Sequence, residues 1–405
     1  MRYRKFGKLD WEVSVLGFGA MRLPVIDHDQ NRIDEPEAIR MIRHAIDSGV
    51  NYLDTAYTYH GGNSEALVGR ALGEGYREHV RVATKLPPWL ATRRDDFDKF
   101  LGEQQERLQT GCIDFYLLHG INAQQWSRLR DQGVLAWAEQ QIARGRIGHL
   151  GFSFHDELDV FKRIVDAYDN WTFCQIQYSF MDVEHQAGRA GLDYAVEKGL
   201  AVAVMEPIRG GQVTSKVPDS IAALWARAGD GRTIVDRALQ FVWDHPGVSV
   251  ALSGMSDMNQ LEQNLGSADR ARAGLLTDDE RALLNEVREQ YARLYPIPCT
   301  SCDYCLPCEN GVRISRIFEM YNDSFIYDDR RRARIRYSML SPDQQADNCV
   351  ECGTCEEHCP QHLPVRDWLK KAHPWLGPNT SYGGKGDRST PFESVRRRHL
   401  TSRKP

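Results

Sequence analysis

Eight of the ten cysteines lie near the end of this 405-residue chain, in two groups with regular spacing. The first group is a C-x2-C-x2-C-x2-C run made of Cys299, Cys302, Cys305 and Cys308. The second is C-x2-C-x2-C-x3-C followed by proline, and contains Cys349, Cys352, Cys355 and Cys359. Three thiolates on one short loop suit three corners of a cubane cluster, whose fourth ligand comes from elsewhere. The two groups therefore predict two 4Fe-4S clusters.

Two other uses of cysteine compete with this interpretation. Disulfides need an oxidising compartment, but the opening segment MRYRKFGKLDWE has no apolar stretch like that of a secretory signal. We therefore expect a cytoplasmic protein with reduced thiols. Zinc sites usually pair one C-x2-C with a second one or with histidines, rather than using a triple repeat. Zinc remains the main alternative, and iron–sulfur clusters are favoured.

Upstream of the cysteines, β-rich apolar segments alternate with amphipathic ones. The amphipathic segments have helical spacing and include residues 35–49, 95–111 and 157–170. The β-rich segments are residues 13–20, 50–56, 80–86, 113–119, 147–154, 172–179, 200–206 and 248–254. Eight strands, each followed by a helix, predict an α/β protein with a (β/α)8 TIM barrel rather than an open sheet. The opening residues predict a small hairpin that turns near Gly7–Asp10.

Prolines mark a boundary between the barrel and the cysteine region. The helical segment 278–295 ends at Tyr295, and Pro296 and Pro298 break its pattern. We expect a barrel over residues 1–295, a small, mostly helical iron–sulfur domain over 296–375 and a poorly ordered tail over 376–405. Between the cysteine groups, five arginines occur from Arg330 to Arg336. This run is either a solvated helix face, which we favour, or a dock for an acidic electron partner.

The composition excludes some classes of partner. Hydrophobic residues make up 41% of the chain and charged residues 26%, as in a soluble globular protein. No apolar run is long enough to span a membrane. The net charge of −5 gives no reason to expect nucleic-acid binding. We therefore expect neither a membrane nor a nucleic acid as a partner.

Four ionisable side chains fall at the ends of three consecutive predicted strands. Asp54 and Tyr59 follow the first, Lys85 ends the second and His119 ends the third. Active sites of (β/α)8 barrels lie at this end of the strands. A nearby ammonium favours the ionised form of a phenol, so Lys85 would make Tyr59 a better proton donor. Asp54 would keep Lys85 charged and aimed, and His119 would orient a carbonyl oxygen. The set predicts proton delivery to a carbonyl substrate.

The segments that carry these residues, LDTAYTYHGGNSE, VATKL and YLLH, resemble signature segments of the aldo-keto reductases. The resemblance covers roughly residues 1–295 and implies that Asp54, Tyr59, Lys85 and His119 are the family's catalytic tetrad. The whole chain is similar to a subgroup with a C-terminal, ferredoxin-like 4Fe-4S domain.

The likeness to two-cluster ferredoxins also implies an exchange of fourth ligands between the cysteine groups. One cluster would then have Cys299, Cys302, Cys305 and Cys359, and the other Cys349, Cys352, Cys355 and Cys308. The first group departs from the ferredoxin pattern, because two residues rather than three precede Cys308 and Pro307 lies before it.

The resemblance further implies that NAD(P)H lies extended across the barrel mouth. The nicotinamide contacts would be Ser153, Gln175 and His155. Phe154 stands where the family usually has Asn, and His155, the next residue, would substitute for that Asn. Met205 stands where an aromatic ring usually stacks on the nicotinamide. The adenosine-phosphate candidates are Ser253, Gly254, Met255, Gln260, Gln263 and Asn264. Gln260 stands where NADP-dependent members often have Arg, so NADH and NADPH both remain open.

Two functions fit these features. The first is reduction of an aldehyde or ketone with NAD(P)H, with Tyr59 as general acid and clusters of structural or redox role. The second is an electron-transfer module, whose clusters link a barrel-bound redox cofactor such as a flavin to a ferredoxin-like partner or larger complex. A non-catalytic cofactor-binding subunit is disfavoured by the complete tetrad. Residues 120–133, with Trp126, are expected to shape the substrate site, but the sequence names no substrate.

Overall fold

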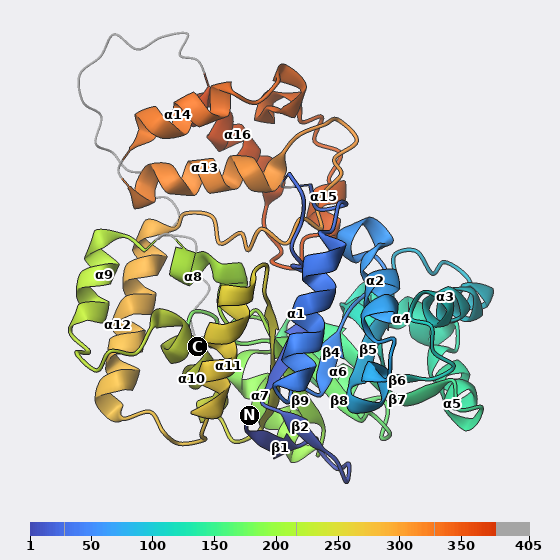
Figure 1. Ribbon diagram of the computed structural model, residues 1–405. Helices are drawn as coiled ribbons and strands as arrows, with labels where there is room; N and C mark the ends of the chain where they lie inside the picture. Colours follow the sequence, from blue (N-terminus) through green and yellow to red (C-terminus); the bar gives the residue numbers. More distant parts are fainter. Residues whose placement is uncertain (28, 216, 328, 378–405) are drawn as a thin grey trace. The chain divides into compact units, whose positions relative to one another are not determined.

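The computed structural model describes residues 1–377 except residues 28, 216 and 328 (Figure 1). The chain opens with a hairpin of β1 (Tyr3–Lys5) and β2 (Glu12–Ser14), which pair antiparallel as predicted. Gly7 lies in its turn with φ +56°, and a Cβ there would be 2.6 Å from the Ala201 backbone nitrogen. Apart from residues 376 and 377, the predicted tail lies outside the described residues.

Eight parallel strands close into a barrel, which confirms the predicted fold. They are β3 (Leu16–Gly19), β4 (Tyr52–Asp54), β5 (Arg81–Leu86), β6 (Ile113–Ile121), β7 (Ile147–Phe154), β8 (Phe173–Gln177), β9 (Ala201–Met205) and β10 (Val248–Gly254). Strand order follows the sequence, and β10 closes the ring against β3. The register pairs Asp54 with Ala83 and Lys85 with Leu117. Asp54 and Lys85 therefore emerge at the same end of the barrel.

Helices cover the outside of the barrel (Figure 1). The α-helices between residues 35 and 294 are α1 (Glu35–Asp47), α2 (Ser64–Ala71), α3 (Arg94–Arg107), α4 (Ala123–Asp131), α5 (Val134–Ala143), α6 (Leu158–Asp166), α7 (Gly188–Glu197), α8 (Gln212–Ser215), α9 (Asp219–Ala226), α10 (Ile234–Asp244), α11 (Met258–Asp269) and α12 (Asp278–Leu294). Short 3-10 turns are η1 (Tyr59–Gly62), η2 (Tyr76–His79) and η3 (Arg209–Gly211). In α1 the buried Ala38, Met41, Ile42 and Ala45 form one face, and the Asp34 side chain caps the helix start.

Aromatic side chains close the end of the barrel opposite the catalytic candidates. Phe6 of the hairpin lies 4.8 Å from Phe115 and 5.6 Å from Phe173, measured between ring centres. Gly151 makes room for this packing, because a Cβ there would lie 2.4 Å from the Phe173 ring. With this end filled, the C-terminal ends of the strands are left for chemistry.

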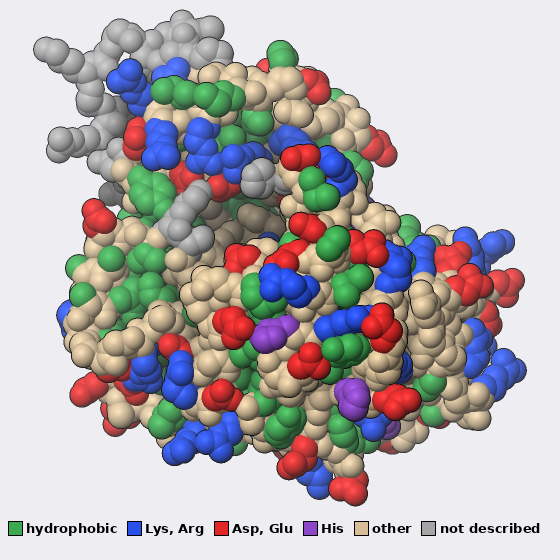
Figure 2. Space-filling model, viewed as in Figure 1, with side chains coloured by type: hydrophobic (Ala, Val, Ile, Leu, Met, Phe, Trp, Pro, Cys, Tyr) green, Lys and Arg blue, Asp and Glu red, His purple; other side chains and the backbone are tan. Residues whose placement is uncertain are grey.

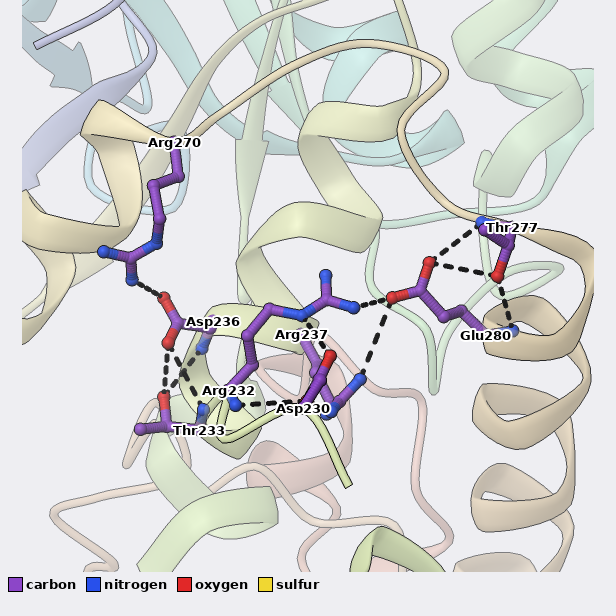
Figure 3. A network of polar contacts seen from close by, with 8 residues as sticks. All are labelled: Asp230, Arg232, Thr233, Asp236, Arg237, Arg270, Thr277 and Glu280. Atoms are coloured by element: carbon purple, nitrogen blue, oxygen red, sulfur yellow. Dashed lines mark hydrogen bonds and ion pairs between the residues drawn. The ribbon is translucent and has the colours of Figure 1, made fainter. Parts of the chain in front are cut away.

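Charged side chains tie α10 to α11 and α12 on the outside of the barrel (Figure 3). Thr233 and Asp236 form a capping box at the start of α10. Asp236 also accepts from Arg270, which lies directly after α11. Glu280 of α12 pairs with Arg232, which precedes α10. The network fixes helices after β9 and β10 and contains none of the predicted catalytic residues.

Contacts divide the chain into two compact units, Met1–Val217 with Ala223–Asn285, and Pro218–Ala222 with the residues from Glu286 onward. The predicted domain boundary at 295 and 296 stays a prediction. The C-terminal unit contains α13 (Ile314–Ile326), α14 (Arg330–Ser338), η4 (Pro342–Gln344), η5 (Ala346–Asn348), α15 (Thr354–Glu357) and α16 (Val365–Leu376). Its core packs α13 against α16 through Phe318, Tyr321, Trp368 and Leu369. Within the described residues, no helix is long and apolar enough to cross a membrane.

The arginine run lies on α14, where Figure 2 shows a row of basic side chains. Arg330 stacks on Trp375, with its guanidinium carbon 3.9 Å from the ring centre. Arg334 donates to the Gly377 carbonyl, and Arg336 pairs with Glu319 and Asp323. These three arginines therefore hold the unit together. Two others, Arg331 and Arg332, are exposed.

Candidate active site and cysteine groups

Lys85 and Asp54 form a buried ion pair at the C-terminal ends of β5 and β4. The Lys85 ammonium donates to Asp54 Oδ1 over 2.6 Å and to the Thr55 carbonyl over 2.7 Å. The Lys85 side chain is fully buried, and Asp54 Oδ2 has no hydrogen-bond partner among the described residues. The pKa of Lys85 lies below its usual range, because burial lowers it by more than the negative charges of Asp54 and Glu65 raise it. The short contacts fix the direction of the ammonium group.

Tyr59 and His119 lie beside this pair. Tyr59 begins η1, and its ring centre is 5.0 Å from Lys85 Nζ. The His119 ring meets the Tyr59 ring edge-on, with centres 5.9 Å apart. Trp89, which sequence reasoning did not single out, has its ring centre 5.0 Å from that of His119. The structure thus brings all four predicted catalytic residues together at the C-terminal end of the barrel.

His119 lies in an environment that keeps its imidazole uncharged. Burial is the main cause, and the nearby Lys85 and His155 add to it, so the pKa of His119 lies well below its usual range. A neutral imidazole has one N–H donor and one acceptor nitrogen. His119 is therefore suited to hydrogen bonding rather than to balancing a negative charge.

A buried network behind β5 supports the Lys85 backbone. Thr84 and Gln104 donate to Glu65 Oε1 over 2.6 Å and 2.8 Å. Gln104 also donates to the Lys85 carbonyl over 3.0 Å, and Arg107 pairs with Glu65 at 3.2 Å. Sequence reasoning missed this network. Its signal is a polar residue on the apolar face of each helix, Glu65 in α2 and Gln104 in α3.

The predicted nicotinamide contacts lie at the ends of β7, β8 and β9. Ser153 accepts from the Gly120 backbone N–H over 2.6 Å, which ties it to the residue after His119. Gln175 donates weakly to the Met205 sulfur at 3.8 Å, and its buried Oε1 has no partner among the described residues. His155 Nδ1 lies 3.1 Å from Gln186 Oε1. Gln175 thus keeps a buried acceptor open beside Met205.

Phe154 and Trp126 belong to the hydrophobic core. Phe154 is fully buried against Phe161, with ring centres 5.2 Å apart, which explains an apolar residue at that position. Trp126 was expected to shape the substrate site, and that expectation is wrong. It lies in α4, is 6% exposed and packs near Trp171 in the layer between strands and helices.

The predicted phosphate contacts surround the start of α11. Ser253 and Asn264 are buried and bonded to each other over 2.9 Å. Met255 is a core residue, and Gln263 is exposed. Gly254 lies against Arg22, whose Cβ would be 3.0 Å from an added Cβ.

The start of α11 is already capped by a carboxylate. The Asp257 side chain accepts from the Gln260 N–H over 2.8 Å. The Gln260 side chain folds back, donating to Asp257 over 2.7 Å and accepting from the Ser256 N–H over 3.0 Å. The free N–H groups expected of an anion site are therefore partly satisfied from within the protein.

A charged group that sequence reasoning missed follows β9. Glu206 and Arg209 both have left-handed backbone conformations, with φ +56° and +46°. Arg209 lies 3.2 Å from Asp182 and Arg22 lies 4.0 Å from Glu206, measured between nitrogen and oxygen. Charged residues with strained backbones at strand ends often mark functional sites. The available signal was the run MEPIRGG, with charges and two glycines directly after a strand.

Four cysteines from both groups line one cavity of the C-terminal unit. They are Cys299, Cys302 and Cys305 of the first group and Cys359 of the second. Apolar side chains also line it, among them Ile314, Phe318 and Val365. The Ser301 N–H points at Cys299 Sγ over 3.4 Å, and backbone N–H groups of residues 361–363 reach Cys359. Burial raises the pKa of the Cys299 thiol to about 11.

The other four cysteines also come near one another. Burial raises the pKa of Cys355 to about 11, and the nearby charges of Cys349, Glu356, Cys352 and Cys308 add to this shift. Cys352 is exposed, whereas Cys308, Cys349 and Cys355 are half-buried. Among the described residues, no three His, Cys, Asp or Glu side chains form a group that would hold a single metal ion. Ligands of a cubane bind separate iron atoms and are spaced more widely.

Comparison with known proteins places this site in a family. The aldo/keto reductase family model matches residues 15–289, which include the barrel strands and all four predicted catalytic residues. The chain belongs to the aldo/keto reductase family. A model of 4Fe-4S dicluster domains matches residues 298–363, so this aldo/keto reductase has an iron–sulfur domain after its barrel.

Relatives of the barrel are oxidoreductases. The chain is 25% identical to the uncharacterized oxidoreductase YqkF of Bacillus subtilis over 72% of its own length and 97% of that protein. It is 26% identical to L-galactose dehydrogenase of Arabidopsis thaliana over 65% of this chain and 87% of that one.

Solved structures of the family share the fold. The holo form of aldo-keto reductase AKR11C1 from Bacillus halodurans matches with a TM-score of 0.58 and 26% identity, over 71% of this chain and 96% of that one. An aldo-keto reductase from Klebsiella pneumoniae in complex with NADPH matches with a TM-score of 0.56 and 25% identity, over 71% of this chain and 95% of that one. The predicted membership in the aldo-keto reductases, with a 4Fe-4S domain, is thereby confirmed.

Proposed function

We propose that this aldo/keto reductase reduces an aldehyde or ketone to an alcohol with NAD(P)H. The observation that carries the proposal is the position of Lys85, whose ammonium is bonded to Asp54 and lies 5.0 Å from the Tyr59 ring centre. A buried cation beside a phenol favours transfer of the phenol proton. In the barrel mouth, Tyr59 is then the proton donor to the carbonyl oxygen.

Each of the other three residues has a role that follows from its environment. Asp54 holds Lys85 by a charge-assisted hydrogen bond, so the ammonium stays directed at Tyr59. His119 is neutral and directs a hydrogen bond at the carbonyl oxygen. Trp89 packs beside His119 and limits the space for the substrate. When bound, the nicotinamide supplies the hydride.

Gln175 supports a nicotinamide in the mouth. Its buried Oε1 lacks a partner among the described residues, and a carboxamide N–H would satisfy it. Ser153, His155 and Met205 lie at the neighbouring strand ends and complete the proposed nicotinamide site. The relative from Klebsiella pneumoniae was solved with NADPH, which supports a nicotinamide cofactor here. The capped start of α11, with Gln260 turned onto Asp257, favours NADH over NADPH.

We further propose two 4Fe-4S clusters with exchanged fourth ligands. The shared cavity of Cys299, Cys302, Cys305 and Cys359 supports one cluster, and the set of Cys308, Cys349, Cys352 and Cys355 supports the other. Backbone N–H groups directed at sulfur are typical of such sites and stabilise thiolates. Buried thiols with raised pKa values must lose protons when iron binds, so loading is coupled to folding. Reduced thiols of this kind suit a cytoplasmic location.

Cofactor consumption under anaerobic conditions tests the proposed reaction. Nicotinamide absorbance is followed with aldehydes and ketones of increasing size, and the alcohol is quantified by mass spectrometry. We expect one alcohol per oxidised NADH or NADPH and no cofactor loss without a carbonyl. Cofactor loss without alcohol, together with reduced clusters, would contradict it.

The exposed Cys352 favours a second candidate function. A cluster whose ligand is exposed can exchange electrons with another protein, which supports an electron-transfer module docking a ferredoxin-like partner. Electron paramagnetic resonance after anaerobic addition of NADH or NADPH tests this candidate. Reduced-cluster signals at stoichiometric amounts support it, and their absence with either cofactor counts against it.

A further inference from the structure

His60 directly follows Tyr59 but is held by a different part of the chain. It is 6% exposed and has a left-handed conformation, with φ 53° and ψ 44°. This conformation is uncommon outside glycine, although histidine tolerates it better than most residues. Because of it the chain turns sharply, and the side chains of Tyr59 and His60 are both buried. Residues in such conformations persist when their surroundings fix them.

Both ring nitrogens of His60 contact the segment that follows β3. The Leu23 N–H donates to His60 Nε2 over 3.1 Å, and Nδ1 lies 2.7 Å from the Gln30 carbonyl oxygen. Since an N–H only donates, Nε2 is the acceptor and Nδ1 carries the hydrogen. Burial lowers the pKa of His60, and hydrogen bonds that the ring makes to backbone groups of Gln30 and Met21 partly oppose this shift. The neutral ring thus makes one contact as acceptor and one as donor.

The same segment contacts η1 at two further points. A Cβ on Gly61 would lie 2.3 Å from Asn31 Oδ1, so the backbone of η1 approaches Asn31 as closely as glycine permits. Asn63 Nδ2 donates to the Asn31 carbonyl over 3.1 Å. His60, Gly61 and Asn63 thus hold the loop that carries Tyr59 against this segment, and His60 supplies two of the hydrogen bonds.

We propose that His60 is a positioning residue that holds the Tyr59 phenol at Lys85 by fixing η1 to Leu23 and Gln30. This inference rests on the proposed carbonyl reduction, in which Tyr59 gives the proton. Both ring nitrogens of His60 are bonded to the segment after β3, so the proposed role is to hold the loop rather than to contact the substrate. Loss of its two hydrogen bonds frees the peptide next to Tyr59 and displaces the phenol.

His245 provides a matched control for His60. It is also 6% exposed, and both of its ring nitrogens are bonded, Nε2 to Asp193 over 2.8 Å and Nδ1 to the Gly247 N–H over 3.0 Å. It lies before β10, at the opposite end of the strands from Tyr59. His245→Ala should cost similar stability without disturbing the phenol.

The experiment compares His60→Ala, His60→Asn and His245→Ala in the full chain. Protein labelled with fluorotyrosine gives a fluorine NMR resonance for Tyr59, assigned through Tyr59→Phe. We expect His60→Ala to shift or broaden this resonance, to lower kcat roughly 10- to 100-fold and to leave the Kd for NADH within about twofold, because a displaced catalytic group costs rate rather than cofactor binding. Added imidazole should restore part of kcat, and His245→Ala should change neither readout.

Two results would overturn the inference. One is an unchanged Tyr59 resonance in folded His60→Ala or His60→Asn; the other is an equal change in His245→Ala. The NMR readout needs no turnover. If the wild-type chain reduces no carbonyl, the proposed function fails while the role of His60 is still tested. If it reduces carbonyls and His60→Ala behaves like wild type, only the inference fails.

Discussion

Lys85 Nζ lies 2.6 Å from Asp54 Oδ1, and both side chains are buried at the mouth of the barrel. Neither charge would be stable there alone, because an unpaired buried ion carries a large desolvation cost. The pair also directs the ammonium toward the Tyr59 ring. The same contact thus stabilises the barrel and prepares the proposed proton donor.

Removing the negative charge of this pair should destabilise the protein strongly. Asp54→Asn leaves the Lys85 ammonium without a counter-charge, and we expect the free energy of unfolding to fall by about 3–5 kcal/mol. Urea denaturation measures the change. The control is Asp166→Asn, which breaks a pair of equal length, 2.6 Å to Lys198, at an exposed position and should change stability little. Equal losses in both variants would contradict a special role for burial.

His119 should make stability depend on pH in the mildly acidic range. Its folded pKa is depressed below the ordinary value of 6.5, so below that pH the unfolded chain binds a proton that the folded chain does not. Stability contributed by the neutral ring is therefore present above pH 6.5 and is lost as the pH falls. His119→Gln should lose less stability on acidification, by up to about 1.4 kcal/mol per pH unit. Parallel curves for both proteins would refute this assignment.

Exchange of cluster ligands predicts which cluster each cysteine serves. Cys359→Ser should disturb the cluster of Cys299, Cys302 and Cys305, because these four line one cavity. Cys308→Ser is the reciprocal variant and should disturb the other cluster. Electron paramagnetic resonance of anaerobically purified, dithionite-reduced protein, with iron quantification, distinguishes the two, because only the reduced clusters are paramagnetic. If each variant damages the cluster of its own sequence group, the ligands are not exchanged.

Cofactor preference should respond to a positive charge at the start of α11. Gln260→Arg places a guanidinium where the side chain now folds onto Asp257, and we expect NADPH to bind about tenfold tighter while NADH changes little. Fluorescence titration with both cofactors measures this. Gln263→Arg on the exposed side of the same helix is the control. Equal gains in both variants would indicate only a general charge effect.

Local sequence patterns predicted the barrel and its tetrad, because short segments are enough to identify each strand and the residues at its end. Each strand is a β-rich run, and Asp54, Lys85 and His119 fall at strand ends, which a parallel barrel must bring to one side. Trp126 was misassigned for a physical reason. Its helix, α4, begins right after β6, so an aromatic side chain near its start packs under the helix rather than in the mouth.

Long-range contacts were not accessible from the sequence. Glu65 is paired through Thr84, Gln104 and Arg107, and His60 through Leu23 and Gln30. No local spacing specifies such partners, since they meet only when the helices and loops pack on the barrel. The arginine run illustrates the same limit. Within the C-terminal unit Arg330 stacks on Trp375 and Arg336 pairs with the carboxylates of an earlier helix, and the local sequence specifies neither contact.

The central claim, that Tyr59 donates the proton, is tested most directly by removing one hydroxyl. Tyr59→Phe is compared with Tyr52→Phe, whose hydroxyl is buried in the barrel and has no partner among the described residues. Single-turnover reduction of a carbonyl by NADH is measured anaerobically for both. We predict a loss of at least about 100-fold for Tyr59→Phe, with cofactor binding retained, and wild-type rates for Tyr52→Phe. Wild-type rates in Tyr59→Phe would contradict the account.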